Sequence, residues 1–276
     1  MIHRRKPALV VLGPLVATLA IAGLAVAATP WNHDPGSAVG PTSWGTIDPA
    51  FAACEAGISQ SPVDISETVR GGGPALVFSY PDNELVVGNT GHVIEVPIPT
   101  DNGHTLRVGG RVYGLNQYHF HAPSEHTLNG RHFDLEVHLV HANAAGALLV
   151  VGVLMDSGDH PNALVDDVFR IAPDVAGEEI ETGLESNARE LLPGRRPGGH
   201  DGRFVLSRYY TYSGSLTTPP CSEPVQWFVA KDPVTVSDFS VTEMHELVSR
   251  FPNYGGYPDN NRPVQPLHGR TTISRG

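Results

Sequence analysis

Apolar and polar residues alternate in short stretches along much of the chain, with turn-forming residues between the stretches. Alternation with a period of two is typical of strands that bury one face. The pattern predicts strands at residues 75–80, 84–87, 92–96, 105–108, 133–140 and 147–155. Helical spacing predicts short helices at 163–171 and 184–192, and Ser240 with Glu243 forms a capping box that predicts the start of a third. Residues 29–53 follow neither period and are expected to be irregular, so the chain as a whole is expected to be mostly β.

The composition supports a folded chain with many turns. Of 276 residues, 40% are hydrophobic and 17% charged, which excludes a fully disordered protein. The 30 glycines and 24 prolines favour turns over long helices. The formal net charge is −11, and a surface this acidic argues against nucleic acid as a partner, because it repels phosphate backbones. No internal repeat or long linker divides residues 29–276, so we expect a single domain there.

The first 28 residues have the pattern of an export signal. Basic residues at positions 3–6 precede an uncharged run from Ala8 to Ala28, and Ala25-Val26-Ala27 is a small-x-small cleavage site. The uncharged run is also long enough to span a bilayer, so an uncleaved anchor is the alternative. We expect a protein exported to the periplasm or the cell exterior, as a monomer or homodimer, with no membrane contact beyond this segment.

The chain has two cysteines, Cys54 and Cys221. In an oxidising compartment they have one intramolecular pairing available, and the alternative is two free buried thiols. Two cysteines this far apart match no ligand spacing of a cysteine-based zinc site.

Residues 117–141 carry the densest candidate chemistry. Side chains alternate faces along a strand, so His119 and His121 share a face with Gln117. On the next predicted strand, His138 shares a face with Glu136. If the two strands pair, the three histidines converge, and three neutral imidazoles without a thiolate suit one catalytic zinc ion with an open fourth position. Gln117, Glu136 and local carbonyl groups are then candidates to orient the imidazoles.

Two other interpretations of these histidines exist. A single His-x-His pair is more often two half-buried polar residues than a ligand pair. His119-x-His121-x-x-x-Glu125 also resembles the first motif of cupins, which bind iron, manganese or other metals. However, Gly114 and Gly130 stand too close for that motif, and its second motif does not appear downstream.

Several longer motifs follow one another in order along the chain. They are Gln60-Ser61-Pro62-Val63-Asp64-Ile65, Gln117-Tyr118-His119-Phe120-His121 with Ser124-Glu125-His126, Glu136-Val137-His138-Leu139-Val140-His141, Gly214-Ser215-Leu216-Thr217-Thr218-Pro219-Pro220-Cys221-Ser222-Glu223, and Arg262-Pro263-Val264-Gln265-Pro266-Leu267. Together they resemble the α-class carbonic anhydrases, in particular the bacterial exported branch, from about Trp31 to Arg270. The resemblance implies one large, twisted, mainly antiparallel sheet with short peripheral helices.

The same resemblance implies an activity and a set of site residues. The activity is the zinc-dependent, reversible hydration of carbon dioxide to bicarbonate and a proton by a zinc-bound hydroxide, with weak esterase activity on the side. His119, His121 and His138 would be the zinc ligands, and Thr217 would accept a hydrogen bond from the hydroxide and donate to Glu125. The substrate would contact Val140, Val150, Leu216, Thr217, Thr218 and Trp227. A disulfide between Cys54 and Cys221 and inhibition by sulfonamides or anions are also implied.

Rapid turnover needs a proton relay with a pKa near 7. His92 and His104 both follow an Asn-x-Gly pattern that resembles the family's relay motif, and the interval to His119 favours His92. Departures from the family pattern lie along the same path: His33 replaces a usual tyrosine, and Thr90 and Glu95 stand where amide side chains are common. The speed of the relay is therefore open.

A different class of function is also compatible with the resemblance. Some relatives use this fold as a catalytically inactive binding module, and these typically lack a zinc histidine. All three histidines are present here, together with Thr217 and Glu125, which favours the enzyme.

Overall fold

Strands make up most of the computed structural model, which describes residues 29–99, 103–194 and 203–276. The predicted export segment, residues 1–28, lies outside the described residues. The helices are α1 (Trp44–Ile47), α2 (Ala53–Ala56), α3 (Ala163–Ile171) and α4 (Asp238–Ser249), with 3-10 segments η1 (Pro49–Phe51) and η2 (Ala188–Leu191). The strands are β1 (Asp64–Ile65), β2 (Thr68–Arg70), β3 (Leu76–Ser79), β4 (Asn83–Asn89), β5 (Ile94–Pro97), β6 (Thr105–Val108), β7 (Arg111–His121), β8 (Thr127–Leu128), β9 (Leu135–Ala142), β10 (Leu148–Ser157), β11 (Glu179–Ser186), β12 (Arg203–Leu206), β13 (Tyr209–Gly214), β14 (Val225–Ala230), β15 (Val234–Val236) and β16 (Thr272–Arg275).

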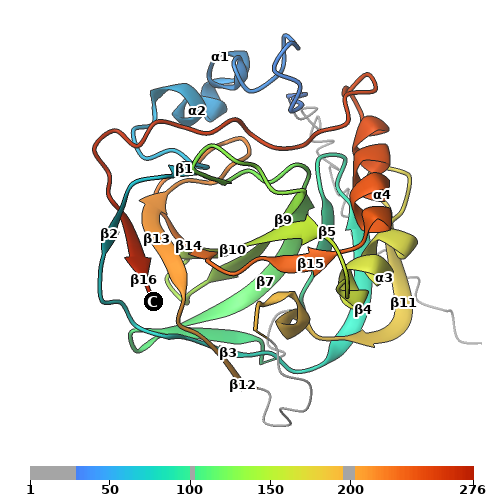
Figure 1. The fold of residues 1–276 in the computed structure, drawn as a ribbon. Coiled ribbons are helices and arrows are strands. Elements are labelled where there is room, and N and C mark those ends of the chain that lie inside the picture. The colour runs from blue at the N-terminus through green and yellow to red at the C-terminus, as the bar shows by residue number, and fades with distance from the viewer. Residues whose placement is uncertain (1–28, 100–102, 195–202) are drawn as a thin grey trace, which may run out of the picture.

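One large mixed sheet organises the described residues. Its strand order is β11-β4-β5-β7-β9-β10-β14-β13-β16-β2, with β3, β6, β12 and β15 attached beside this path. Most neighbours are antiparallel, whereas β10 is parallel to β14 and β15, and β16 is parallel to β2. The helices lie at the periphery of the sheet (Figure 1). This is the mainly antiparallel sheet with short peripheral helices that the sequence led us to expect.

The two faces of the sheet bury different clusters of side chains. On one face, Leu139, Val151 and Phe228 belong to the main hydrophobic core. On the other face, Val150 and Trp227 belong to a smaller apolar cluster. Because side chains alternate along each strand, β9, β10 and β14 contribute to both clusters. The second face is the one that carries the histidines described below.

Most predicted elements are found within one to three residues of their predicted bounds, but three expectations were wrong. The helix predicted at 184–192 is instead the end of β11 followed by η2. The third helix begins at Asp238, and its N-cap is Ser237, whose hydroxyl accepts from the Ser240 N–H, so Ser240 lies inside the helix. Residues 29–53 are not wholly irregular, because they contain α1, η1 and the start of α2.

Among the described residues, no helix is both long and apolar enough to cross a membrane.

Candidate metal centre

Strands β7 and β9 place three histidines side by side. The strands pair antiparallel, with His119 opposite His138 and His121 opposite Glu136. A register shift between Leu115 and Gln117 separates this pairing from the far end of β7. Directly opposed residues of an antiparallel pair project to the same face. The pairing on which convergence of the three histidines depended is therefore present.

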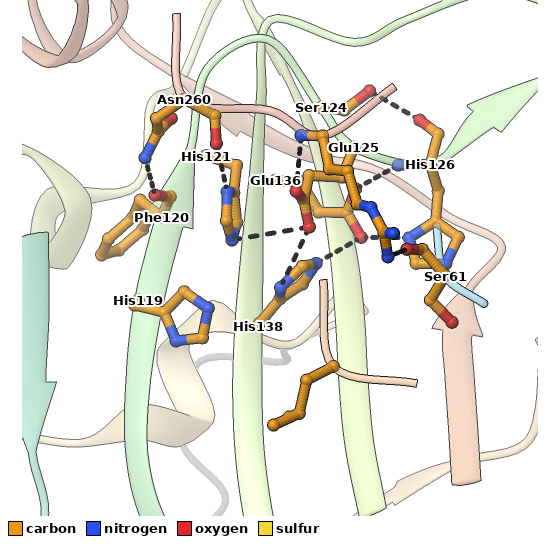
Figure 2. Close-up of polar contacts among 12 residues, drawn as sticks. Ser61, His119, Phe120, His121, Ser124, Glu125, His126, Glu136, His138 and Asn260 are labelled. Carbon is orange, nitrogen blue, oxygen red and sulfur yellow. Dashed lines mark hydrogen bonds and ion pairs between the residues drawn. The ribbon is translucent and has the colours of Figure 1, made fainter. Parts of the chain in front are cut away.

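The three imidazole rings form a compact group (Figure 2). Their centroids are 5.1 Å apart for His119 and His121, 5.2 Å for His119 and His138, and 4.6 Å for His121 and His138. One nitrogen from each ring lies within 4.8 Å of the other two. His121 and His138 are buried and His119 is half-buried, so the group is reached from the His119 side.

One nitrogen of each ring is already held by a neighbour. His119 Nδ1 is 2.8 Å from Gln117 Oε1, His121 Nδ1 is 2.9 Å from the Asn260 carbonyl oxygen, and His138 Nε2 is 2.9 Å from Glu136 Oε1. Each acceptor requires an N–H, which leaves the other nitrogen of each ring with a free lone pair. The free atoms are His119 Nε2, His121 Nε2 and His138 Nδ1. Such outer acceptors fix the tautomer and direction of metal-binding imidazoles.

Burial keeps these rings neutral. Desolvation lowers the pKa of all three histidines, and it lowers the pKa of His121 to about 4. Neutral imidazole is the form that binds a metal ion. His121 Nε2 is buried and has no hydrogen-bond partner. An unpartnered buried nitrogen facing two others is costly in isolation, and a bound cation would satisfy it, so the residues fit a three-histidine metal site.

Glu136 connects the histidine group to a second buried network. Its Oε1 accepts from His126 Nδ1 at 2.8 Å as well as from His138, and its Oε2 accepts from the His126 backbone N–H at 2.8 Å. The Tyr212 hydroxyl extends this hydrogen-bond network, because it lies 2.7 Å from His126 Nε2 and donates to Ser61 Oγ at 2.8 Å. Burial alone would raise the pKa of Glu136, but the charges and hydrogen bonds of His126 and His138 outweigh it and hold this pKa well below the ordinary value.

His126, Glu136 and His138 are also close enough to be considered as a second metal site. Their facing atoms are already joined by hydrogen bonds of 2.8 and 2.9 Å. A metal ion there would have to displace both protons, so this group serves better as the support of His138.

Glu125 lies beside the free nitrogens of His121 and His138, and the Thr217 side chain lies next to Glu125. Glu125 Oε1 accepts from the Arg262 backbone N–H at 2.8 Å, and Oε2 is 3.6 Å from His121 Nε2 and 3.8 Å from His138 Nδ1. Burial raises the pKa of Glu125 to about 7, against the opposing effects of His138, the Thr217 side chain and the Arg262 N–H. Thr217 itself is buried at the start of the turn that leads to β14.

Comparison with known proteins agrees with this site. The family model of eukaryotic-type carbonic anhydrases matches residues 39–275. The chain belongs to this family. A carbonic anhydrase of Neisseria gonorrhoeae is 38% identical over 84% of this chain and 84% of its own length, and one of Klebsiella pneumoniae is 33% identical over 92% and 95%. The α-carbonic anhydrase of Thermovibrio ammonificans, solved with the inhibitor sulfanilamide, is 35% identical with a TM-score of 0.77 over 89% of this chain and 99% of that one. The chain is therefore an enzyme of the carbonic anhydrase family, whose reaction is the hydration of carbon dioxide.

Four of the six positions assigned to substrate by the family resemblance lie in or against one apolar cluster. Val150 and Trp227 are buried in it, and Val140 and Leu216 are half-buried against it. The Trp227 ring centroid is 4.8 Å from that of His138, which places this cluster next to the histidines. Thr218 is half-buried in the turn after Thr217, and its carbonyl oxygen accepts from the Cys221 N–H.

The two candidate relay histidines occupy different places. His92 stacks on Trp31 with 3.7 Å between ring centroids, and burial lowers its pKa to about 4. His33 lies between Trp31 and Tyr254 and 6.4 Å from the His121 ring, centroid to centroid. His104 instead packs beside Tyr80, which bonds to His141, in the main core on the opposite face of the sheet. Of the two, His92 is the one on the same side as the carbonic anhydrase site.

Cys54 and Cys221 form the disulfide that the resemblance implied. It joins α2 to the turn that carries Thr217 and Thr218. Gln60 Nε2 donates to the Cys221 carbonyl oxygen, which ties the same turn to the segment before β1.

Sequence reasoning missed two residues of the site. Asn260 is fully buried, and its backbone carbonyl holds His121 while its side chain bonds to Ala122 and Phe120. A carbonyl acceptor can come from any residue type, so no side-chain pattern points to it.

Gly152 is the second missed residue. It lies opposite His138 on β10, where a Cβ would stand 2.7 Å from Glu136 Oε1. A glycine inside a predicted buried strand was the signal for this close approach.

Proposed function

We propose that this chain catalyses the reversible hydration of carbon dioxide to bicarbonate and a proton, with one zinc ion held by His119, His121 and His138. The observation that carries the proposal is the convergence of three neutral imidazoles whose outer nitrogens are each fixed by an acceptor. Zinc in such a site acts as a Lewis acid and lowers the pKa of water to about 7, which supplies a nucleophile at neutral pH.

Thr217 and Glu125 would direct the reacting water. A Thr217 hydroxyl that donates to the Glu125 carboxylate can only accept from the water, which aims the oxygen lone pair at carbon dioxide. The proximity of Thr217 to the Glu125 carboxyl, and the Arg262 N–H that fixes the other carboxyl oxygen, support this role.

The apolar cluster beside the histidines would receive the substrate. Carbon dioxide is small and carries no charge, so an apolar wall can hold it without competing for the polar groups. The half-buried Val140 and Leu216 would form the accessible part of the wall, and Val150 and Trp227 would support it from behind. Thr218 and the Thr217 backbone N–H would contact substrate oxygen.

His92 would transfer the proton to solvent. Its position on the site's side of the sheet supports this, but stacking on Trp31 desolvates the ring and keeps its pKa far below the value of about 7 that suits a relay. We therefore expect turnover at neutral pH to depend on external buffer, and weak hydrolysis of activated esters to accompany hydration.

The cellular setting follows from the N-terminal sequence and the disulfide. A basic segment, an apolar run and a small-x-small site support export to the periplasm or cell exterior, with residues 1–28 as the signal and 29–276 as the catalytic domain. The Cys54–Cys221 bond suits an oxidising compartment. Sulfonamides and small anions should inhibit the enzyme, because its relative from Thermovibrio ammonificans was solved with the inhibitor sulfanilamide.

Stopped-flow hydration of carbon dioxide tests the proposal. The protein is stripped of metal and then given one equivalent of zinc, and a matched sample receives zinc after His119→Ala substitution. We expect a zinc-restored rate that sulfanilamide abolishes and that the variant lacks. Efficient proton transfer would bring the rate to the order of 10⁶ per second. A lower zinc-dependent rate would indicate the slow proton relay described above. A folded, disulfide-bonded sample with no zinc-dependent rate would instead be an inactive binding module.

A further inference from the structure

A large groove lies on the face of the sheet opposite the histidines. On β14, Trp227 points toward the histidine site, so the alternating residues Gln226 and Phe228 point to the other face, and both line the groove. The groove has a volume of about 790 Å³ and runs between the β6–β7 hairpin and strands β13, β14 and β16. This volume falls within the range of about 300–1,000 Å³ that is usual for small-molecule sites.

The floor of the groove is aromatic and apolar. Phe228 packs edge-on against Tyr209 with 5.0 Å between ring centroids, and Tyr113 lines the same floor. These rings are largely buried, whereas Ile273 at the rim is 38% exposed. The groove therefore offers a ring-shaped ligand the exposed side chain of Ile273 and the small exposed parts of Tyr113 and Phe228 as apolar contacts.

The groove is lined by positive charges, whereas the chain as a whole has a net negative charge. The chain has 29 acidic and 18 basic residues, yet among the described residues no Asp or Glu lines the groove, whereas Arg111 and Arg275 do. Arg275 is positioned by a hydrogen bond to the Ser207 carbonyl oxygen and lies over the Tyr209 ring. Arg111 is exposed, and within the described part of the chain its side chain forms no ion pair or hydrogen bond. Guanidinium groups bind carboxylate and sulfonate oxygens well, because their planar N–H groups can donate in pairs.

We propose that this groove is a second binding site, for a small aromatic organic anion. The aromatic body would pack against Ile273 and the exposed parts of Tyr113 and Phe228, and the carboxylate or sulfonate would pair with Arg111 and Arg275. The groove and the histidine group lie on opposite faces of the sheet and share a neighbour in Tyr212, which lines the groove and bonds to His126 through its hydroxyl. The proposal does not depend on the function proposed above.

A fluorescent aromatic sulfonate, 8-anilinonaphthalene-1-sulfonate, tests the site. It is titrated into the folded protein in the presence of saturating sulfanilamide, which occupies the histidine site. We expect saturable binding that sulfanilamide leaves unchanged. N-phenyl-1-naphthylamine, which has the same rings without the sulfonate, should bind at least about tenfold more weakly.

Two variants and a matched control locate the binding. Arg111→Glu removes the free cation, and Ser213→Trp fills the groove from an exposed position on β13. Each should weaken binding of the sulfonate at least about tenfold and leave carbon dioxide hydration unchanged. Arg107→Glu makes the same charge change at an exposed arginine on β6 that does not line the groove, and it should change binding less than about twofold.

Three results would overturn the proposal. Displacement of the probe by sulfanilamide would place it at the histidine site. Equal weakening by Arg107→Glu and Arg111→Glu would mean that only the general surface charge attracts it. A light-scattering mass of a dimer that Ser213→Trp converts to a monomer would make the groove an interface between two copies of this chain.

Discussion

Glu136 holds two histidine rings with a single carboxylate oxygen. Its Oε1 accepts from both His126 and His138, so a small displacement of this oxygen changes the direction of His138. The space for Oε1 exists because residue 152 on the adjacent strand has no side chain. The direction of His138, the third proposed metal ligand, therefore depends on Glu136 and on Gly152 behind it.

Gly152→Ala should weaken zinc binding about 10- to 100-fold, the range typical of a disturbed outer partner of a metal ligand. The added methyl group would stand 2.7 Å from Glu136 Oε1 and push it away from His138. Zinc affinity is measured by competition with a chelator, so the readout does not depend on catalysis.

Gly114→Ala is the matched control for this change. Gly114 is also a strand glycine, but the nearest atom to its added Cβ is the Ala142 carbonyl oxygen at 3.9 Å. Zinc affinity should be unchanged in this variant. If both variants lose the same affinity, the close approach at Gly152 is not what positions Glu136.

His92→Ala should lower turnover at neutral pH and low buffer concentration by only about two- to fivefold, well below the roughly 10²–10⁴-fold attributed to general acid–base groups, because a ring with a pKa of about 4 relays protons slowly. Imidazole added to the solution should restore it, and should also accelerate the unaltered enzyme, because the stacked His92 has a pKa of about 4 and rarely accepts a proton. Turnover is followed by stopped flow.

His104→Ala serves as the control, because His104 lies beside Tyr80 in the core behind the sheet. It should leave turnover and its dependence on imidazole unchanged. Equal turnover of the His92→Ala variant and the unaltered enzyme would remove His92 from the relay and direct attention to His33.

At the scale of elements, sequence periodicity was a good guide to the six strands that it predicted, but it did not find β13 and β14, which are also buried on at least one face. The strand predicted at 105–108 is β6 without change, and the helix at 163–171 is α3, with Leu164, Val165 and Val168 buried on one side. The alternation around His119 and His138 gave the correct faces, because strand geometry leaves no other choice. These elements were predictable because local pattern and tertiary burial agree.

The segment at 184–192 was not predictable in this way. Leu184, counted there as part of an apolar helical face, is 49% exposed at the edge of the sheet. Strand β11 gains its stability from pairing with β4, a contact nearly one hundred residues away in sequence. Asn187 then accepts from the Arg189 N–H and starts η2. The conformation of this segment is therefore determined by long-range strand pairing, which local hydrophobic periodicity cannot predict.

Helix α4 is tied to the segment that carries Asn260. His245 Nδ1 is 3.0 Å from the Pro258 carbonyl oxygen and 3.1 Å from Asp259 Oδ1. The Asp259 hydrogen bond raises the pKa of His245, and burial opposes this shift only in part. A histidine whose pKa is raised on folding adds stability that is fully present below its unfolded pKa of about 6.5 and disappears as pH rises through the folded pKa.

His245→Gln should therefore lower stability more at pH 5.5 than at pH 9. The pair is about one third exposed, so we expect less than about 1 kcal/mol, or a Tm decrease of about 2–4 °C at the lower pH. Asp259→Asn should have the same effect, and the double variant should be no worse than either single one. Equal losses at both pH values would show that packing, and not the ion pair, is what His245 contributes.

At the scale of the whole molecule, segments from both ends of the described chain meet over the histidine site. Arg262 is buried, and its guanidinium donates to the Gln60 side chain and to the carbonyl oxygens of Ser61 and Cys54, while its backbone N–H holds Glu125. The disulfide reaches the same region, from Cys54 to the turn after Thr217. Glu125, beside the proposed metal site, is thus held by contacts between positions up to about two hundred residues apart. The order of the motifs indicated this meeting of distant segments only through the family resemblance.

The disulfide should contribute most of its effect through the unfolded chain. It closes a loop of 167 residues, and loss of that constraint costs roughly 5 kcal/mol in the chain-entropy model. The Cys54→Ala, Cys221→Ala double variant should therefore unfold at a Tm lower by on the order of 10 °C. When the bond is absent, Gln60 and the Thr218 carbonyl oxygen still hold the turn at residue 221, and Arg262 still holds α2 through the carbonyl oxygen of residue 54. Zinc-dependent turnover of the folded variant at 25 °C should therefore change little. Thermal unfolding by circular dichroism and stopped-flow hydration are measured on the same samples, and a reductant should destabilise the unaltered protein but not the variant. A variant with an unchanged Tm but a large loss of turnover would reverse the argument, because the bond would then act by positioning Thr217 in the native state.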